Sequence, residues 1–572
     1  MNPVAPPHAG ADILIRNAKV ITCDAAFRIA RAVAVKDGRI LAVGDDDLPA
    51  LTDAGTQVID AGGGAVMPGL IDCHAHLDRE GLKPVFPSLS GCTSIDDVLQ
   101  RIEALVKERA PGEWIVTMPI GEPPYYWDVP GNLREKRFPT RWELDRVSPR
   151  NPVYIRPIWG FWRHTLPITS IANSLALELA GLHPGMEPPP GSIVFEKGGS
   201  GRFNGIIHEN NFMPVAELAW FSAMPRFDHG HRVAGIRDAM RIYNRSGTTS
   251  VFEEHGCAQE LIQAYRAVHV AGDATVRAHL VFSPSWQFIR ADQYAPVLQS
   301  WAGWLGQGGM GDEWLRVEGL YSEIGVTPES LLRLRARPYT GWSGFNADCG
   351  LPREHIVDVL TEAARNDIRV VAIWMSMLEV FEEVNRRVPL VGKRWVIGHL
   401  RTATPDQIRR IRELGLVMSA HTNRYVYKEG HLLREELGHD REDEIAPLRS
   451  LVEAGVHIGF ATDNVPTSLF WPVWQSVTRY NRYSDDAIAP EQALSREQAL
   501  RCATIEGAHL TFEEDVKGSL EPGKYADLVM LSDDPLTCPD DALKDIVALK
   551  TMVGGKVVHD RETDKTNRHA RT

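Results

Sequence analysis

Residues 394–421 read RWVIGHLRTATPDQIRRIRELGLVMSAH, and this stretch decides the fold because it contains a strand, a helix and a second strand in succession. Thr404 and Pro405 predict a helix start, since Thr is a favoured N-cap and Pro is favoured at the first helical position. Gly415 is typical of a helix end. The apolar runs WVIGHL and LVMSAH on either side are typical of buried strands. The stretch therefore predicts a strand–helix–strand unit of an α/β protein.

The same alternation continues in both directions along the chain. Helix LPREHIVDVLTEAARND, for example, stands before another apolar run. We predict strands at 66–76, 248–255, 275–282, 315–324, 368–376, 394–400, 416–421 and 457–463. Eight strands that alternate with helices favour a (β/α)₈ barrel of the TIM type, and an open doubly wound sheet is the alternative.

The two ends of the chain have a different pattern. Short β-like runs separated by turn pairs such as Asp37-Gly38 and Gly554-Gly555 are typical of antiparallel hairpins. Neither end has enough apolar area to be stable alone. We therefore predict one discontinuous β-sandwich domain from residues 1–65 and 510–572, and a barrel domain from 66–509.

A long insertion at about 84–240 separates the first two predicted barrel strands. It is rich in Pro, Trp and Tyr, as in GEPPYYWDVPG at 121–131 and RPIWGFWRH at 156–164. A connection of this length exceeds what a βα loop needs. We expect it to cover a ligand site at the barrel mouth, and packing between subunits is the alternative.

Composition excludes several classes of protein. The chain has 572 residues, with 62 Lys+Arg against 75 Asp+Glu and a net charge of −13, and it has no dense basic run. We therefore expect no nucleic-acid partner. No apolar run is long enough to span a membrane, the N-terminus has no signal-peptide pattern, and the seven cysteines form no CxxC pair. We expect a cytoplasmic enzyme with a small-molecule substrate and no membrane partner.

A metal site is the central functional prediction. His74 and His76 end the apolar run AVMPGLIDCHAH, and residues i and i+2 of a strand face the same way. Paired imidazoles at the carboxyl end of a barrel strand can bind Zn²⁺. Asp463 ends the last predicted strand, where it could bind the same ion and take a proton from the attacking water. The alternative role for Asp463 is an N-cap.

Further histidines end other predicted strands. They are His255, His399 and His421 on the second, sixth and seventh strands. One histidine at a strand end is usually a packing residue, but several on one rim suggest an active site. The sequence has no GxSxG elbow, Walker loop or Cys–His signature.

Together these motifs resemble the amidohydrolase superfamily, and within it the YtcJ-like (amidohydrolase 3) branch. The resemblance covers nearly the whole chain, through VMPGLIDCHAHLD, PTRWELDRVSPRNPV, NSLALELAGL, VIGHLRTATPDQIRRIRELG, ATDNVP and GSLEPGKYADLVML. It implies a metal-bearing barrel, a β-sandwich from both termini and hydrolysis of amide or other C–N bonds, and it is compatible with a homodimer.

The resemblance also implies roles for individual residues. His74 and His76 match first-strand metal ligands, His399 a sixth-strand histidine, and Asp463 the catalytic aspartate. Two positions depart from the family pattern: Tyr321 stands at the position of a bridging fourth-strand lysine, and Trp374 at that of a fifth-strand histidine. Both losses affect a second metal, so one ion is favoured over two.

Glu323 offers a replacement ligand. If the fourth strand continues, Glu323 lies two residues beyond Tyr321 on the same face, nearer the barrel mouth. Its carboxylate could then bind the metal. The alternative is a surface or salt-bridged residue.

We therefore expect a hydrolase with a single divalent ion, most simply Zn²⁺, held by His74, His76, Asp463 and Glu323. Asp463 and His399 would act in catalysis, with Asp463 as general base. His255, Trp374 and His421 would contact a small, apolar or aromatic N-substituted amide. The alternatives are a mononuclear deaminase, lyase or isomerase chemistry on the same scaffold, and a binding protein that has lost its activity.

Overall fold

The computed structural model describes residues 10–563, apart from 46–47, 127, 159–165, 184–185, 187–190, 211–213, 326–331, 333–335, 337 and 347. Trp127 and most of the aromatic stretch 156–164 therefore lie outside the described residues. Of the helices that are described, none is both long and apolar enough to cross a membrane.

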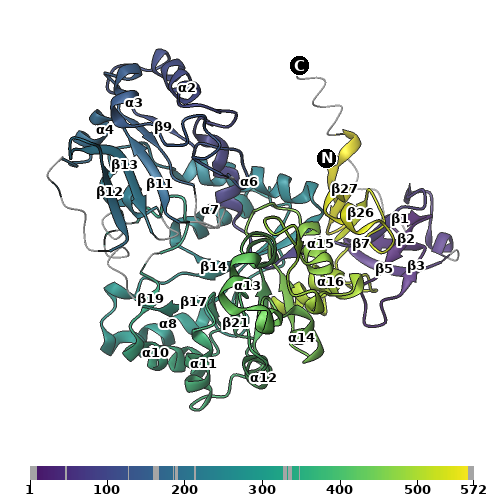
Figure 1. Cartoon of the computed structure of the whole chain (residues 1–572). Coiled ribbons are helices and arrows are strands. Elements are labelled where there is room, and N and C mark those ends of the chain that lie inside the picture. The colour runs from purple at the N-terminus through teal and green to yellow at the C-terminus, as the bar shows by residue number, and fades with distance from the viewer. Residues whose placement is uncertain are drawn as a thin grey trace, which may run out of the picture.

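A parallel eight-stranded barrel forms the centre of the protein (Figure 1). Its strands, in ring order, are β8 (Leu70–Asp72), β14 (Thr248–Cys257), β15 (Arg277–Phe282), β17 (Leu315–Tyr321), β20 (Val370–Ala372), β21 (Val396–Ile397), β22 (Val417–Ala420) and β23 (Ile458–Phe460). Backbone hydrogen bonds from Cys73 N to Phe460 O (2.9 Å) and from Asp463 N to His74 O (2.9 Å) join the first strand to the last. These features confirm the predicted (β/α)₈ fold.

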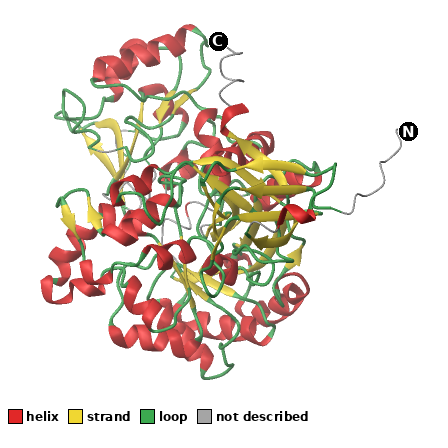
Figure 2. Ribbon diagram, turned by 90° about the vertical axis from the view of Figure 1, so that its right-hand side faces the viewer, coloured by secondary structure: helices red, strands yellow, loops and turns green. Residues whose placement is uncertain are grey.

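The barrel helices form where the capping signals predicted them, and they lie outside the strands (Figure 2). Helix α12 (Pro405–Leu414) has a capping box between Thr404 and Gln407, and it ends at Gly415, whose φ is +65°. Its buried residues Ile408, Ile411 and Leu414 follow helical spacing. Helix α10 (Arg353–Arg365) likewise packs one apolar face on the barrel.

Most barrel strands are shorter than the predicted ranges, and two of the predicted strands are each divided into two. The predicted strand 66–76 is two strands, because the chain leaves β7 (Ala65–Pro68) in a terminal sheet and enters the barrel as β8. Gly69 lies at this switch, where a Cβ would be 2.2 Å from the Thr249 side chain. The predicted strand 315–324 ends at Tyr321, and the following β18 (Glu323–Ile324) pairs with β19 (Gly350–Leu351) outside the barrel sheet.

Strands from both chain ends form two further sheets. One contains β5 (Arg39–Gly44), β4 (Ala32–Lys36), β1 (Ile13–Arg16) and β6 (Gln57–Asp60); the other contains β28 (Lys556–Asp560), β27 (Ala548–Val553), β26 (Leu528–Leu531), β7, β2 (Lys19–Ile21) and β3 (Ile29–Ala30). Strand β26 pairs antiparallel with β7, which joins the C-terminal to the N-terminal part of the chain. Side chains of both sheets, including Val33 and Leu528, pack in one apolar cluster, as a sandwich of both termini requires.

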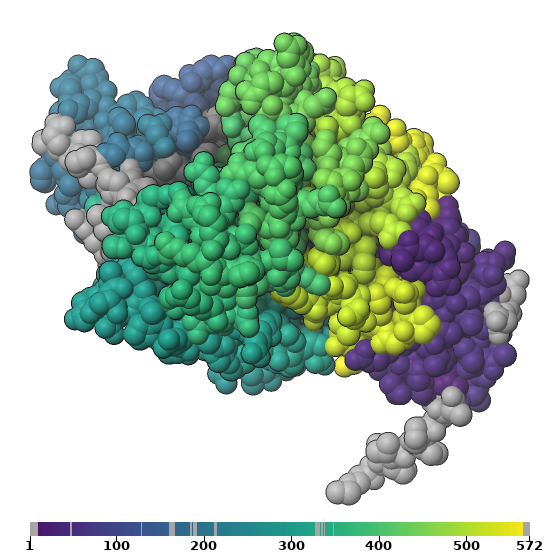
Figure 3. All heavy atoms as spheres, turned by 90° about the horizontal axis from the view of Figure 1, so that it is seen from below, coloured from purple at the N-terminus to yellow at the C-terminus, as the bar shows by residue number. Residues whose placement is uncertain are grey.

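The insertion forms a separate lobe between β8 and β14. Its sheet has the order β12 (Ile193–Lys197), β13 (Phe203–Glu209), β11 (Ile168–Ala172), β10 (Val153–Ile155) and β9 (Ile115–Thr117), and it is accompanied by helices α2 (Ile95–Lys107), α3 (Arg141–Val147) and α4 (Ser174–Leu179). The lobe and the terminal sheets lie at opposite ends of the molecule (Figure 3). Its apolar core extends to Val465 and Phe345. Because Val465 follows the last barrel strand, the lobe packs against the carboxyl end of the barrel.

Candidate active site

The first and last barrel strands bring three predicted ligands together. His74 and His76 follow β8, and Asp463 follows β23. All three side chains are buried. Asp72 joins the two strand ends, because its carboxylate accepts hydrogen bonds from the backbone N–H groups of His74 (3.1 Å) and Thr462 (3.0 Å).

The donor atoms of these residues face one point. The Nε2 atoms of His74 and His76 lie 2.8 Å apart. Oδ1 of Asp463 lies 3.3 Å from Nε2 of His76 and 3.8 Å from Nε2 of His74. The side chains therefore converge as the sequence predicted.

The backbone at Asp463 adopts a left-handed conformation, in a turn that lies against His76. Asp463 and the next residue, Asn464, have φ values of +49° and +64°. The Asn464 side chain accepts a hydrogen bond from His76 N (3.0 Å) and donates one to His76 O (2.7 Å), which fixes the turn. Such left-handed conformations at non-glycine residues cluster at functional sites.

Two glutamates that the sequence analysis did not assign orient the imidazoles. Nδ1 of His74 donates to Glu254 Oε2 (2.5 Å), and Nδ1 of His76 donates to Glu253 Oε2 (2.9 Å). A carboxylate that accepts from Nδ1–H leaves the Nε2 lone pair for a metal. Glu253 is held by Leu77 N and the Tyr265 hydroxyl, and Glu254 by Ser419 Oγ.

A shift of register in β14 makes this arrangement possible. Consecutive residues of a regular strand point to opposite faces, yet Glu253 and Glu254 both reach the histidines. The pairing of β14 with β15 shifts register between Glu253 and Cys257, which re-aims these side chains. The sequence signal was the pair of acidic residues inside the apolar segment TTSVFEEHGC.

The residues fit a divalent metal ion. Because both Nδ1 atoms are directed at glutamates, the two Nε2 atoms meet at 2.8 Å, where lone pairs repel unless a proton or a metal cation lies between them. Asp463 and Glu253 raise the pKa of His76 despite its burial, so this point favours positive charge. Burial lowers the pKa of His74 to about 3, so its ring is neutral and can act as a ligand. Although burial opposes it, the neighbouring imidazoles of His76 and His74 lower the pKa of Asp463 and keep it ionised. Two histidines and one carboxylate form a typical three-residue ligand set for catalytic zinc.

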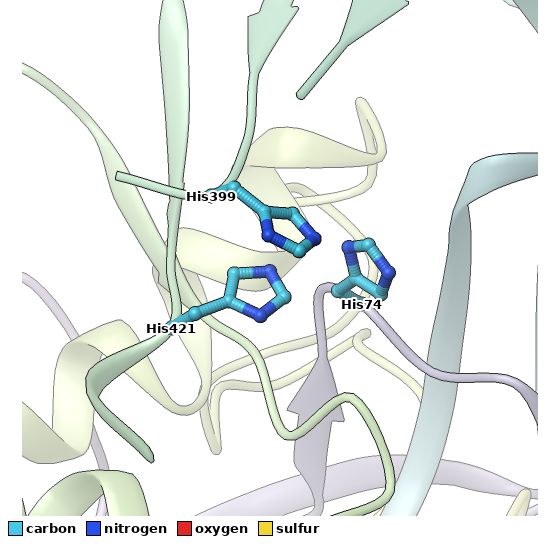
Figure 4. Close-up of side chains that lie close together, drawn as sticks. All are labelled: His74, His399 and His421. Carbon is cyan, nitrogen blue, oxygen red and sulfur yellow. The ribbon is translucent and has the colours of Figure 1, made fainter. Parts of the chain in front are cut away.

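His399 and His421 lie on the other side of His74. Their rings stack with centroids 4.0 Å apart, and His421 lies 4.5 Å and His399 5.0 Å from His74 (Figure 4). One nitrogen from each of the three lies within 4.8 Å of the others. The described residues thus contain two overlapping groups of possible ligands, His74–His76–Asp463 and His74–His399–His421, which share His74.

The other predicted site residues surround these groups. The His255 ring lies 6.2 Å from His74 and stacks on Phe345 at 4.2 Å. The Trp374 indole lies 5.8 Å from His399. Glu323 is in neither group of possible ligands among the described residues. Its Oε2 instead accepts hydrogen bonds from Tyr321 and from Trp374 Nε1, both at 3.0 Å.

Two buried cations near the site were not predicted. Arg79 follows the HxH motif in α1 (Leu77–Leu82), with its guanidinium 5.9 Å from the Phe345 ring. Lys428 lies after β22, with its ammonium 4.7 Å from the ring of Tyr125, which comes from the insertion. Burial lowers the pKa of Lys428 to about 7. Neither residue belongs to a recognisable motif, so only the fold reveals it.

Comparison with known proteins identifies the family. Residues 57–559 match the model of the amidohydrolase family. The chain is 26% identical over 570 residues to an N-substituted formamide deformylase of Arthrobacter pascens, covering 96% of this chain and 98% of that protein. It is 21% identical over 523 residues to the putative amidohydrolase YtcJ of Bacillus subtilis (strain 168), covering 88% and 91%.

A solved structure has the same fold. The crystal structure of an uncharacterized metal-dependent hydrolase from Pyrococcus horikoshii superimposes with a TM-score of 0.67 at 21% identity, covering 92% of this chain and 99% of that one. The sequence match, the barrel and the converging histidines agree. The chain belongs to the amidohydrolase family, in its YtcJ-like branch, and is a hydrolase that acts on carbon–nitrogen bonds.

Proposed function

We propose that this enzyme hydrolyses the C–N bond of a small N-substituted amide, with one Zn²⁺ ion held by His74, His76 and Asp463. The observation that carries the proposal is the meeting of two Nε2 atoms and one carboxylate oxygen at a single point. The similarity to an N-substituted formamide deformylase supports the substrate class.

A divalent ion bound there would activate a water molecule and polarise the amide carbonyl. Asp463 is placed to take the proton from that water and to return it to the leaving nitrogen. His399 and His421 lie beside His74, where an N–H group of either ring can stabilise negative charge on the carbonyl oxygen. Glu253 and Glu254 keep His74 and His76 in the tautomer that these roles require.

The shared histidine favours one ion over two. Nδ1 of His74 is occupied by Glu254, which leaves Nε2 as its only free ligand atom. The two ligand groups both need that residue, so they describe alternative partners of one ion. Ligand atoms that bind one ion at about 2.2 Å lie within about 4.4 Å of one another. Glu323 is not part of the proposed ligand set, because it belongs to neither group of described residues whose ligand atoms lie within 4.8 Å of one another.

Aromatic side chains supply the walls for the substrate. His255, stacked on Phe345, and Trp374, beside His399, flank the ligand groups. Tyr125 adds a ring from the insertion. This supports an apolar or aromatic N-substituent. We further propose a cytoplasmic enzyme, in keeping with seven cysteines that are all buried and form no disulfide bond among the described residues.

The proposal is tested with purified protein loaded with metal. Elemental analysis should find close to one divalent ion per chain, and His74→Ala with His76→Ala should lose it. The enzyme is then assayed on a panel of aryl and alkyl formamides, other amides and lactones. We expect it to convert amides of the panel to acid and amine products, and the Asp463→Ala variant serves as the blank. Release of ammonia from aminated heterocycles, without any amide hydrolysis, would instead support a deaminase.

A further inference from the structure

Glu323 is an acidic side chain at the barrel mouth for which the described residues supply no charged partner. It is half-buried, and its Oε2 accepts hydrogen bonds from Tyr321 and Trp374 Nε1. Within the part of the chain that the structure describes, no Lys or Arg forms an ion pair with it, and no group donates to Oε1. Carboxylates removed from bulk water are normally paired with a cation, because an unpaired charge is costly there.

The two donors place this carboxylate beside the reaction site. The ring of Tyr321 lies 4.9 Å from that of His255, and the ring of Trp374 lies 5.8 Å from that of His399. Glu323 thus joins Tyr321, which lies next to His255, to Trp374, which lies next to His399. Its fixed Oε2 leaves Oε1 as the acceptor for a ligand. Burial raises the pKa of Glu323, against the effect of its two hydrogen bonds, and no described Lys or Arg opposes this shift.

The surroundings of Glu323 suit a protonated amine. The carboxylate accepts hydrogen bonds from an indole N–H and a phenol O–H, and neither donor carries a positive charge that would repel an ammonium group. A neutral donor would gain only an ordinary hydrogen bond, whereas an ammonium would form a charge-assisted one, which is roughly twice as strong.

We propose that Glu323 binds a protonated primary amine at the far end of the substrate's N-substituent, so that the substrates are mono-acylated diamines. This inference rests on the proposed amide hydrolysis, and it makes Glu323 a specificity residue instead of a metal ligand.

The test uses pairs of formamides of increasing chain length. Each pair contains an N-formyl-α,ω-diaminoalkane and the N-formylalkylamine in which methyl replaces the terminal ammonium. The metal-loaded wild-type enzyme should prefer the ammonium compound at the best length by about tenfold or more in kcat/KM. Glu323→Gln keeps the size and the acceptor for Tyr321 and Trp374, and it should reduce this preference about tenfold or more. Glu379→Gln, at an exposed position of α11 (Met377–Asn385), is the matched control and should keep the preference.

A measurement of metal content distinguishes a role of Glu323 in substrate specificity from a role as a metal ligand. The Glu323→Gln protein should retain the wild-type amount of ion; its loss would overturn the inference in favour of a ligand. Equal or better use of the methyl compounds by the wild-type enzyme at every length would also overturn it. If no amide is hydrolysed, the proposed function fails, and calorimetric binding of the same compounds then decides the inference. Tighter binding of the ammonium compound by wild type than by Glu323→Gln supports it, and equal binding refutes it.

Discussion

The carboxylate of Glu254 lies 2.5 Å from Nδ1 of His74, on the side of the ring opposite the nitrogen that faces His76. This contact fixes which nitrogen carries the proton and therefore which nitrogen can bind a metal. The same contact connects the register shift of β14, the second barrel strand, to the proposed metal ligands that follow β8, the first barrel strand.

We expect Glu254→Gln to weaken metal binding by about 10–100-fold, because the partner that orients His74 loses its charge. Competition with a chromophoric chelator measures the affinity. Glu435→Gln, at an exposed position of α13 (Gly430–Leu437), serves as the control and should bind metal as the wild type does. An unchanged affinity in Glu254→Gln would show that Glu254 does not orient the ligand.

Removal of the metal and loss of Asp463 should have separable effects. Dialysis against a chelator should abolish activity, and addition of Zn²⁺ should restore it. Asp463→Asn should lower kcat by about 10²–10⁴-fold even when metal is present, because the proton acceptor is gone. Rapid-mixing rates on metal-saturated enzyme check this, and near-normal turnover by Asp463→Asn would exclude Asp463 as the base.

Gly81 should tolerate no side chain. It lies in α1 where this helix meets α6 (His229–Arg245), and a Cβ there would be 1.8 Å from the backbone oxygen of Gly235. Gly81→Ala must separate the two helices, so it should lower the apparent Tm and the soluble yield. Gly303→Ala is the matched control in α8 (Tyr294–Leu305). No atom of a neighbouring element lies within 4 Å of the Cβ that would be added at Gly303. Gly303→Ala should therefore raise the free energy of unfolding by about 0.5–1 kcal/mol. Equal Tm values for the two variants would contradict this prediction.

A buried ionic network near the beginning of β14 and β15 should make stability depend on pH. Glu513 pairs with Lys517 and lies 2.7 Å from Nε2 of His279, and Lys517 also donates to Ser250 (2.8 Å). Burial opposes both shifts, but Lys517 and His279 lower the pKa of Glu513, and the Glu513 charge raises the pKa of His279.

The two pKa shifts define a pH window. The lowered pKa of Glu513 gives stability that is present above its unfolded value of about 4.3 and lost as the pH falls. The raised pKa of His279 gives stability that is present below its unfolded value of about 6.5 and lost as the pH rises. Glu513→Gln should therefore lower the free energy of unfolding most near pH 5–6, by about 3–5 kcal/mol. Thermal unfolding across pH checks this, and a cost that does not vary with pH would count against the network.

The fold was predictable because its signals are local. Thr404, Pro405 and Gly415 mark a barrel helix, and the structure has that helix with those caps. His74, His76 and Asp463 were predictable as a group because strand ends meet at one rim, and the structure brings their donor atoms together. Whether these residues bind the ion remains a prediction.

The rest depended on irregular backbone. The position of Glu323 was argued from strand alternation, but β17 ends at Tyr321 and Glu323 starts a separate short pairing with Gly350. The roles of Glu253 and Glu254 depend on a register shift that the residue pattern does not predict. Contacts that depend on such departures cannot be read from periodicity.

The hydrogen bonds that join β8 to β23 have a consequence for assembly. Two of the proposed ligands come from the start of the barrel and the third from its final strand, so a growing polypeptide lacks the carboxylate ligand until residue 463 has emerged. The proposed ligand set is therefore complete only when the ring is complete. An ion bound there would resist reopening of the same seam, because its binding energy would be lost when the strands separate.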